Sequence, residues 1–454
     1  MKVQLYSLIM MGLLSQAPVQ ASTIAIIDSG TDMKHETIAP KAWINTGEID
    51  GNNRDEDRNG YQDDIHGWNF AESNNQVIDY KYLGTLNDDI KKFFDIQAKM
   101  MRGTASTEEV KWLQEKVKEE EFIKSLSIYG NFMHGTHVAG ISAQKSQDAK
   151  IMAVKLIPTE VKLPFMLGLE SQNVDDKGWI ETLVKKGIDL LANQQMTQLE
   201  EISFYVAGHK ARVANGSFGT GYPQAKMIVE TVYKQILRKE PDPVEVKKYA
   251  KYFINSLIKS GGKIIEAAPN TLFVYAAGND GLNNDEYGTS PANIKGDNVL
   301  SVAATMGLTS LAPFSNYGKK LVDVAAPGVG ILSAAPGDEY IRVSGTSQAA
   351  PFVAGVAGRV LDINPELSSL EVKKIIMGTV DKKDFLSETV TTGGIVNVDR
   401  AVRAAILTQS ISLKDAISRS LNEVQDTRDA ESVVPFKTQY QKGLILPLSS
   451  GFKL

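Results

Sequence analysis

A chain of 454 residues, of which 43% are hydrophobic and 23% charged, can bury a large core and has the composition of an ordinary soluble globular protein. The formal net charge of −5 gives no sign of a basic surface, so we expect no nucleic-acid partner and no anionic-membrane partner. The sequence contains no cysteine, which excludes disulfides, zinc–thiolate sites and a cysteine nucleophile.

The first residues have the pattern of an export signal. Lys2 precedes an apolar run over residues 5–14, and residues 19–21, Val-Gln-Ala, are a typical small-residue cleavage site. The run is too short to cross a bilayer, so the pattern favours a removed signal peptide, residues 1–21, over a membrane helix. A buried first strand or helix is the alternative. We predict a protein exported to the periplasm or the extracellular space, without stable membrane insertion, whose mature chain begins at Ser22.

Short apolar runs bounded by turn residues are typical of strands in a parallel sheet that is covered on both faces. Helical patterns, such as residues 179–191 and 370–377, lie between these runs. This alternation predicts an α/β fold: a doubly wound, mostly parallel sheet with helices on both faces. Functional sites in such sheets form beyond the carboxyl ends of the strands. The predicted strands are residues 23–27, 151–157, 271–277, 298–304 and 321–326.

Two Lys- and Glu-rich helical stretches, at about 88–126 and 223–259, interrupt the alternation. Their opposite charges often stand four residues apart, as on the solvated face of a helix. We therefore predict two helical insertions in a domain that spans residues 22–408. Residues 409–454 form a C-terminal tail that begins with an amphipathic helix and ends in extended apolar pieces. We predict that its last part, residues 433–454, packs on the domain.

The stretch IRVSGTSQAAPFVAGVAGRV, residues 341–360, places Gly-Thr-Ser before a run of small residues. Pro351 is tolerated only in the first turn of a helix, so the helix should begin near Ser347. A serine at that place is either a helix cap or a nucleophile beside the positive end of the helix dipole. The second interpretation requires a histidine, an acid and an oxyanion donor elsewhere in the chain.

Candidate partners for Ser347 follow predicted strands or begin a predicted helix. Asp28 and Asn279 each come directly after a strand, where parallel sheets build sites, although both residue types are also common in turns. The motif HGTHVAGI places His134 and His137 at the head of a small-residue helix. Two histidines on one helix face suggest a metal pair, but the motif holds no acid and the chain no cysteine. One histidine acting as a base therefore fits better.

The motifs AIIDSGTD, HGTHVAG, YAAGND and GTSQAAPFVAG resemble, in sequence and in order, those of the subtilisin-like serine proteases. The resemblance implies a subtilisin-like peptidase domain and a serine endopeptidase that acts on polypeptides through an acyl-enzyme on Ser347. It implies that His134, and not His137, takes the proton and that Asp28 orients it. Asn279 and the backbone N–H of Ser347 would hold the oxyanion.

Two further segments resemble the strands between which members of this family bind an extended peptide by backbone hydrogen bonds. Ordinary sheet edges are the alternative. The implied substrate-binding residues are Ser217, Phe218 and Gly219 in VANGSFG and Ala276, Ala277 and Gly278 in YAAG.

The stretch DEDRNGYQDD, residues 55–64, has oxygen-bearing side chains at the alternating positions of a calcium loop. Many members of the resembling family bind calcium through a similar stretch between the same two motifs. His66 stands where an EF-hand has its closing glutamate, so the site must close differently. We predict structural calcium and no organic cofactor, with a solvated acidic turn as the alternative. The predicted ligands are Asp55, Asp57, Asn59, Tyr61, Asp63 and Asp64.

The chain also departs from the family pattern. The signal peptide and the strand of Asp28 leave no room for a prodomain, so we expect unaided folding or help from the insertions or the tail. Residues 35–40, HETIAP, lack the aspartate with which relatives hold another calcium ion, and Gln348 is a candidate substrate contact. Two alternatives to an active enzyme are a binding protein that kept the fold and an enzyme kept latent by its tail or insertions.

Overall fold

The computed structural model of the chain describes residues 21–160, 177–234 and 240–428. The predicted signal peptide, apart from Ala21, and the apolar stretch 433–454 lie outside these residues. Among the described residues, no helix combines the length and the apolarity that crossing a bilayer requires.

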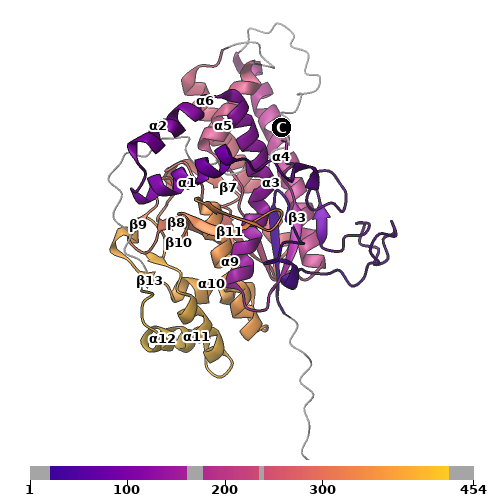
Figure 1. Cartoon of the computed structure of the whole chain (residues 1–454), viewed down its shortest axis with the longest axis vertical. Helices are drawn as coiled ribbons and strands as arrows, with labels where there is room; N and C mark the ends of the chain where they lie inside the picture. Colours follow the sequence, from indigo (N-terminus) through magenta and orange to yellow (C-terminus); the bar gives the residue numbers. More distant parts are fainter. Residues whose placement is uncertain (1–20, 161–176, 235–239, 429–454) are drawn as a thin grey trace, which may run out of the picture.

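A twisted central sheet forms the middle layer, with strand order β13-β14-β10-β8-β6-β4-β1-β3-β2 and β9 paired with β8 (Figure 1). All pairs are parallel except β13 with β14 and β9 with β8, which confirms the predicted sheet. The strands are β1 (Thr23–Asp28), β2 (Gly67–Asn69), β3 (Lys150–Lys155), β4 (Val213–Gly216), β6 (Leu272–Ala276), β8 (Val299–Met306), β9 (Ser310–Leu311), β10 (Val324–Pro327), β13 (Asp381–Lys382) and β14 (Gly394–Ile395). Two short antiparallel pairs join β5 (Thr220–Gly221) to β7 (Thr289–Ser290) and β11 (Ile331–Ala335) to β12 (Glu339–Val343).

Helices cover both faces of the sheet. Alternate residues of a strand point to opposite faces, and because both sets are apolar here, each face needs a covering layer. In β1, Ile24 and Ile26 belong to one core, whereas Ala25 and Ile27 belong to the other. The first core includes residues of α3 (Glu120–Lys145), α9 (Thr346–Ile363), α10 (Ser369–Gly378) and α11 (Val398–Thr408). The second includes residues of α4 (Lys177–Gly208), α5 (Tyr222–Val232), α6 (Pro243–Ser260) and α7 (Gly262–Ala267). The remaining helices are α1 (Asp88–Arg102), α2 (Thr107–Lys116), α8 (Asn284–Tyr287), α12 (Leu413–Glu423) and the 3-10 turns η1 (Ala39–Lys41), η2 (Tyr80–Tyr82) and η4 (Asp384–Leu386).

The small residues of α9 let this helix pass through the first core at very short range. A Cβ on Gly355 would lie 2.8 Å from the carbonyl oxygen of Ser142 in α3, and a Cβ on Gly358 would lie 2.7 Å from Ile24 in β1. Real Cβ atoms do not approach other atoms so closely. The composition after Ser347 thus explains how α9 seats against both α3 and the sheet.

The first insertion adds α1 and α2 and then continues into α3 without a break. Asn87 caps α1 by accepting a hydrogen bond from the N–H of Ile90, and Ser106 and Glu109 form a capping box for α2. The 26-residue helix α3 carries His134 near its middle, so the prediction that this histidine begins a helix is wrong. The helical register of the insertion simply runs on into the motif.

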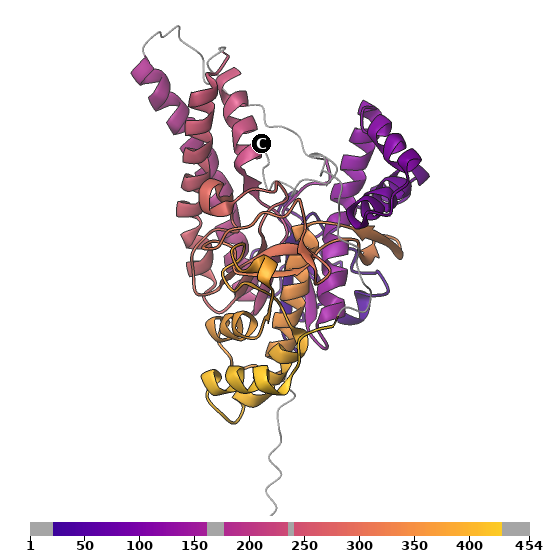
Figure 2. The same ribbon diagram turned by 90° about the vertical axis from the view of Figure 1, so that its left-hand side faces the viewer.

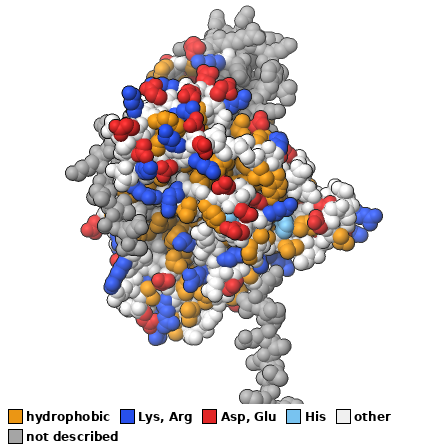
Figure 3. All heavy atoms as spheres, viewed as in Figure 1, with side chains coloured by type: hydrophobic (Ala, Val, Ile, Leu, Met, Phe, Trp, Pro, Cys, Tyr) orange, Lys and Arg blue, Asp and Glu red, His pale blue; other side chains and the backbone are white. Residues whose placement is uncertain are grey.

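The two insertions lie on opposite sides of the molecule, with α1 and α2 apart from α4, α5 and α6 in Figure 2. The first has its own core, in which Phe93, Phe94 and Phe122 pack with Ile341 and Val343 of β12. The second contributes buried side chains to the core of the sheet, including Tyr249 and Phe253 of α6. Neither insertion is only a solvated face. On the face in Figure 3, Lys and Arg side chains intermingle with Asp and Glu.

The beginning of the tail forms the predicted amphipathic helix, α12, which packs beside α11 at the lower end of Figure 1. After α12 the chain returns to the domain through Arg400 of α11, whose guanidinium lies 3.0 Å from Asp381 and 2.7 Å from Asp426. The predicted packing of residues 433–454 stays a prediction, because these residues lie outside the described part of the chain.

Candidate active site

Asp28 ends the buried strand β1 between β3 and β4 and is fully buried. Its Oδ1 lies 2.7 Å from Nδ1 of His134 and also accepts a hydrogen bond of 2.7 Å from the N–H of Ser29. The other carboxylate oxygen, Oδ2, is buried without a hydrogen-bond partner among the described residues. A carboxylate in this position holds the N–H of His134 on Nδ1, which leaves Nε2 as the proton acceptor.

Two glycines allow α3 to approach the end of β1 closely enough for this pair. Gly30 has a φ of +116°, which L-residues rarely adopt, and its carbonyl oxygen would lie 2.2 Å from a Cβ on Gly135. The N–H of Gly135 donates to Oγ of Ser29. The glycines that follow Asp28 and His134 in their motifs are therefore a matched pair that sets the distance between the acid and the base.

His137 is a core residue on the same helix. It is fully buried, and its Nε2 donates to the carbonyl oxygen of Ile341 at 3.0 Å. Burial lowers the pKa of His137 to about 3, so the side chain is neutral at physiological pH. This placement supports His134 as the base and gives no support to a histidine metal pair. Gln348 is also buried, with its amide 3.5 Å from Nδ1 of His137, and its contact with substrate stays a prediction.

Ser347 is the second residue of α9, and the helix cap is Gly345, without a side-chain capping bond. The interpretation of Ser347 as a capping serine is therefore wrong. Its backbone N–H, like those of every first helical turn, has no partner within the helix. Its hydroxyl donates to the carbonyl oxygen of Ser217 at 3.2 Å, and Oγ of Ser217 in turn donates to the carbonyl oxygen of Ser347 at 3.0 Å.

The hydroxyl of Ser347 makes no hydrogen bond to His134 in the described structure. Attack on a substrate therefore requires the hydroxyl to leave the Ser217 carbonyl and turn towards Nε2 of His134. Contacts between a nucleophile and its base commonly tighten only when substrate is present. When the hydroxyl turns away, the carbonyl oxygen of Ser217, directly beside the nucleophile, becomes free to accept another hydrogen bond.

Asn279 is held against the first turn of α9. Its side-chain oxygen accepts hydrogen bonds from the N–H and the hydroxyl of Thr346, at 2.9 and 2.8 Å. Gly278 makes the turn before it with a φ of +118°, and a Cβ there would meet Asn316 at 2.3 Å. With the oxygen fixed, the amide nitrogen is the end that can donate to a developing oxyanion. Sequence reasoning missed Thr346, although its place between Gly345 and Ser347 in the motif is the available signal.

The predicted substrate-binding residues differ in whether their backbone N–H and C=O groups already have hydrogen-bond partners. Residues 217–219 leave β4 beside Ser347, with the Phe218 ring buried in the core and Gly219 facing Ser290 of β7 at a distance that excludes a Cβ. Ala276 and Ala277 lie in or just after the central strand β6. The N–H of Ala277 donates to Val302 and its carbonyl oxygen accepts from Asn284, which leaves one lone pair of that oxygen for a further donor. The substrate contacts of all six residues stay predictions.

The acidic loop, residues 45–64, brings together a different set of side chains from the one predicted. Carboxylate oxygens of Glu48, Asp55 and Asp57 lie within 4.8 Å of one another. Glu48 is almost fully buried, and its oxygens accept hydrogen bonds from the N–H groups of Glu56, Asp57 and Asp63. Sequence reasoning missed Glu48 because it lies seven residues before the motif. A cluster of three carboxylates without a cationic side chain fits a hard cation such as calcium.

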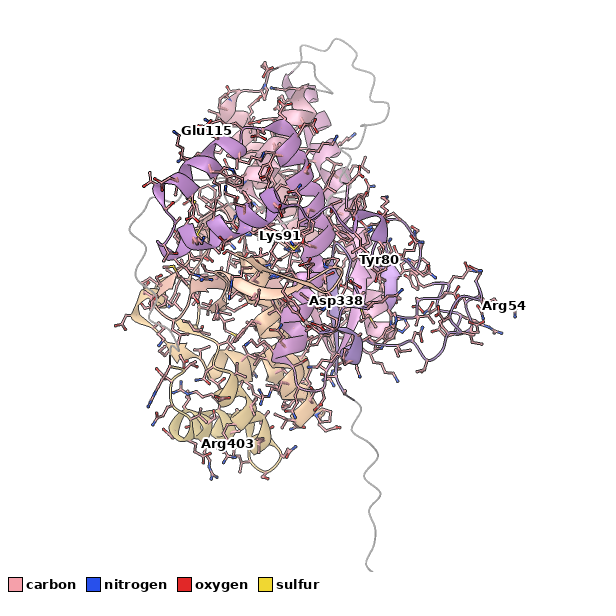
Figure 4. All side chains as sticks on the ribbon, in the orientation of Figure 1. Arg54, Tyr80, Lys91, Glu115, Asp338 and Arg403 are labelled. Atoms are coloured by element: carbon pink, nitrogen blue, oxygen red, sulfur yellow. The ribbon has the colours of Figure 1, made fainter. Side chains whose placement is uncertain are left out.

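The other predicted ligands mainly hold the loop in place. Asp64 is fully buried and accepts hydrogen bonds from Asn45, Asn59 and the Tyr205 hydroxyl of α4, with His209 3.2 Å away. The carboxylate of Asp63 accepts from the N–H groups of residues 52 and 53, and the Tyr61 hydroxyl donates to Glu201. The side chains of Asn59, Tyr61, Asp63 and Asp64 are thus not part of the carboxylate cluster. Figure 4 shows Arg54 at the tip of this projecting loop.

A buried Asp–His pair, a serine in the first turn of a helix and an asparagine fixed to the same turn define the kind of site that serine peptidases use. The family model described as the Subtilase family matches residues 20–403. The chain therefore belongs to the subtilase family of serine peptidases.

Relatives of this chain are distant and mostly longer. It is 24% identical to subtilisin-like protease 1 of Plasmodium falciparum (isolate 3D7) over 412 residues, which cover 89% of this chain and 47% of that protein. It is 28% identical to subtilisin BL of Lederbergia lenta over 270 residues, which cover 60% of this chain and 77% of the relative. The chain spans about half the length of the first relatives it matches.

Solved structures with a similar chain path include a lanthipeptide protease, with a TM-score of 0.47 and 18% sequence identity over 84% of this chain and 86% of that chain. A cold-adapted subtilisin-like serine proteinase gives a TM-score of 0.41 and 19% identity over 83% of this chain and 86% of that chain.

Proposed function

We propose that this subtilase is an exported serine endopeptidase that hydrolyses polypeptides through an acyl-enzyme on Ser347. The observation that carries the proposal is the 2.7 Å contact between Asp28 and His134 of α3, a helix that packs against α9, whose first turn holds Ser347. Asn279, fixed by Thr346, lies at the same turn. Export is supported by the sequence pattern of residues 1–21 and by the entry of the chain into the buried strand β1 directly afterwards.

The proposed reaction begins when Oγ of Ser347 attacks the carbonyl carbon of a peptide bond and Nε2 of His134 takes the hydroxyl proton. Asp28 stabilises the imidazolium that forms. The amide of Asn279 and the N–H of Ser347 donate to the oxyanion of the tetrahedral intermediate. His134 then gives its proton to the leaving amine, and a water molecule hydrolyses the acyl-enzyme by the same steps in reverse order.

A fluorophosphonate probe tests this proposal directly, because it reacts only with a serine that a neighbouring base activates. We expect covalent labelling of the wild-type chain at Ser347, no labelling of Ser347→Ala, and strongly reduced labelling of His134→Ala. Ser142→Ala is the matched control. The buried hydroxyl of Ser142, in α3, donates to the carbonyl oxygen of Pro351 in α9, the helix that carries Ser347, but it lies outside the site. Labelling of this control should persist.

The same experiment separates the alternatives. A folded wild-type chain without label is a binding protein that kept the fold. Labelling that appears only after removal of residues 409–454 identifies an enzyme kept latent by its tail. Mass spectrometry of the labelled peptide then shows whether Ser347 is the modified residue.

We also propose that calcium binds the acidic loop through Glu48, Asp55 and Asp57. Three carboxylates within 4.8 Å of one another repel each other strongly unless a cation lies between them. Calcium accepts oxygen ligands in a flexible geometry, and it would supply charge compensation here rather than chemistry. Asp63 would support the ligands by holding the backbone of the loop, and Asp64 by holding the loop on α4.

A further inference from the structure

The start of the mature chain predicted above, Ser22, is tied to the end of the helix that carries the nucleophile. The backbone nitrogen of Ser22 lies 2.9 Å from Oδ1 of Asp362, and its hydroxyl lies 2.8 Å from the same oxygen. The hydroxyl also lies within 3.1 Å of the carbonyl oxygen of Gly358. Ser22 is 7% exposed, whereas Ala21 before it is partly exposed. Burial of the chain therefore begins at Ser22.

Asp362 is a carboxylate in an unfavourable place. It lies in the last turn of α9, where the carbonyl groups of the helix already carry partial negative charge, and that turn holds no basic residue. Among the residues the structure describes, Asp362 forms no ion pair. Its other oxygen accepts a hydrogen bond of 3.3 Å from the backbone N–H of Asp148.

No lysine side chain reaches Asp362 with a hydrogen bond among the described residues. Lys41 interacts with Asp362 only through its charge, because its ammonium donates to the carbonyl oxygens of Ala143 and Ser146. The side chain of Lys150 donates to the carbonyl oxygen of Pro40, and its backbone N–H donates to Ser22. The nitrogen in direct contact with Asp362 that can become a cation is the backbone nitrogen of Ser22.

We infer that hydrolysis of the peptide bond between Ala21 and Ser22 supplies this charge and locks the catalytic helix. Water adds across the bond, so that Ala21 leaves with a carboxylate and Ser22 keeps an α-ammonium group. The ammonium then forms an ion pair with Asp362 in place of an amide hydrogen bond. This inference rests on the export signal in the proposed function, and it assigns Asp362 as the receptor of the new N-terminus.

A separate peptidase must make this cut. Ser347 and Asp362 stand at opposite ends of α9, which at about 1.5 Å per residue separates them by about 22 Å. Ala21 and Ser22 lie at the amino end of β1, whereas Asp28 and the active site lie at its carboxyl end. Ala21 also lines a cavity of about 680 Å³ that is open to solvent.

The first experiment measures the intact mass of the full chain exported by a bacterial host, in the Ser347→Ala background. We expect a protein that begins at Ser22, since the cut does not need this chain's own nucleophile. A chain that begins at another residue, or that keeps residues 1–21, would overturn the inference. Because the background is inactive, this result does not depend on the proposed peptidase activity.

The second experiment compares the processed chain with unprocessed full chain made in the cytosol, by thermal unfolding. Asp362→Asn keeps an oxygen that accepts from an amide but removes the charge that pairs with an ammonium. We expect it to lower Tm by several degrees in the processed chain and by much less in the unprocessed one. Glu366→Gln, which removes a nearby exposed charge, is the matched control and should leave Tm unchanged in both forms.

A third measurement keeps the inference testable if Asp362→Asn is poorly folded. In the processed chain with wild-type Asp362, the ion pair should protect the α-amino group of Ser22 from an amine-reactive reagent. We expect its reaction to be several-fold slower than in the same protein after unfolding in urea. Equal Tm losses in the processed and unprocessed chains, or equal reaction rates, would show that Asp362 only accepts a backbone hydrogen bond.

Discussion

The catalytic site and the acidic loop hold their side chains by different means. Asp28, His134 and Ser347 stand on the end of a strand and on two packed helices, at distances set by contacts such as that between Gly30 and Gly135. The loop has no regular structure around Glu48, Asp55 and Asp57, and hydrogen bonds from its backbone N–H groups to its own carboxylates maintain its course. The first region should therefore respond to changes in packing, and the second to changes in charge.

The largest effect should come from the reacting groups of the rigid site. We expect Ser347→Ala or His134→Ala to lower kcat by about 10⁴–10⁶-fold, and the double variant to cost little more, because the residues act as one unit. The size is the one established for this family's triad rather than one derived from this chain. Steady-state hydrolysis of a peptide substrate measures it.

His137→Ala is the control for this prediction. It removes a neutral core histidine, so it should reduce stability while the folded fraction keeps most of its turnover. A greater loss of turnover in folded His137→Ala than in His134→Ala would reverse the assignment of the base.

Loss of the oxyanion donor should have the next largest effect. Asn279→Ala is expected to lower kcat by about 10²–10³-fold with little change in KM, because the amide acts on charge that develops only in the transition state. This size, too, comes from oxyanion donors of the family. Thr346→Val, which removes one of the two hydrogen bonds that fix Asn279, should give a smaller loss in kcat. A change confined to KM would mean that Asn279 binds the substrate and the transition state equally.

The contact between the two motif glycines offers a purely steric test. Gly135→Ala places a Cβ 2.2 Å from the carbonyl oxygen of Gly30, so α3 must move away from β1 and take His134 with it. A shift of about 1 Å in a catalytic group costs about 10²-fold in rate, and we expect a loss of that size together with a lower Tm.

Gly187→Ala in α4 is the matched control for that test. It meets nothing within 4 Å, so it should stabilise the protein by about 0.4–1 kcal/mol and leave kcat unchanged. Full activity in Gly135→Ala would show that the spacing between acid and base does not depend on this contact.

The same contrast explains what the sequence alone could reveal. The sheet was predictable because continuous apolar runs bounded by turn residues pack in few ways. The triad followed only from the resemblance of four ordered motifs to those of the family, because Asp28, His134 and Ser347 each had another interpretation when taken alone. The start of α3 was not, because the charged helical pattern of the insertion runs into the histidine motif without a breaking residue. Glu48 was not, because its approach to Asp55 and Asp57 depends on the course of an irregular loop. The resting contact of Ser347 with Ser217 is a choice of rotamer, which no sequence pattern encodes.

Changes in the acidic loop should have the smallest effects of those considered, and we expect an effect on the calcium response only from substitutions that remove charge from the carboxylate cluster. Removal of calcium with a chelator leaves Glu48, Asp55 and Asp57 to repel one another, so we expect Tm to fall by several degrees. Binding to the folded state alone contributes RT ln(1 + [L]/Kd), about 2.7 kcal/mol at a hundredfold excess over Kd. Glu48→Gln with Asp57→Ala should abolish this response to calcium.

Asp64→Asn tests whether Asp64 binds the ion itself or only holds the loop in position. Asp64 connects the loop to Tyr205 of α4 and to His209 just after this helix, so its replacement should lower Tm whether or not calcium is present and leave the size of the calcium response largely intact. Asp50→Asn, an exposed change in the same loop, should alter neither quantity. Differential scanning calorimetry with and without calcium measures all three variants.

If Asp64→Asn instead removed the calcium response while Glu48→Gln kept it, the ion would bind near α4 through Asp64, which belongs to the ligand set that the sequence predicts. A packed helix, rather than the loop's own backbone, would then set the geometry of the ion site, as packed helices set the geometry of the catalytic site.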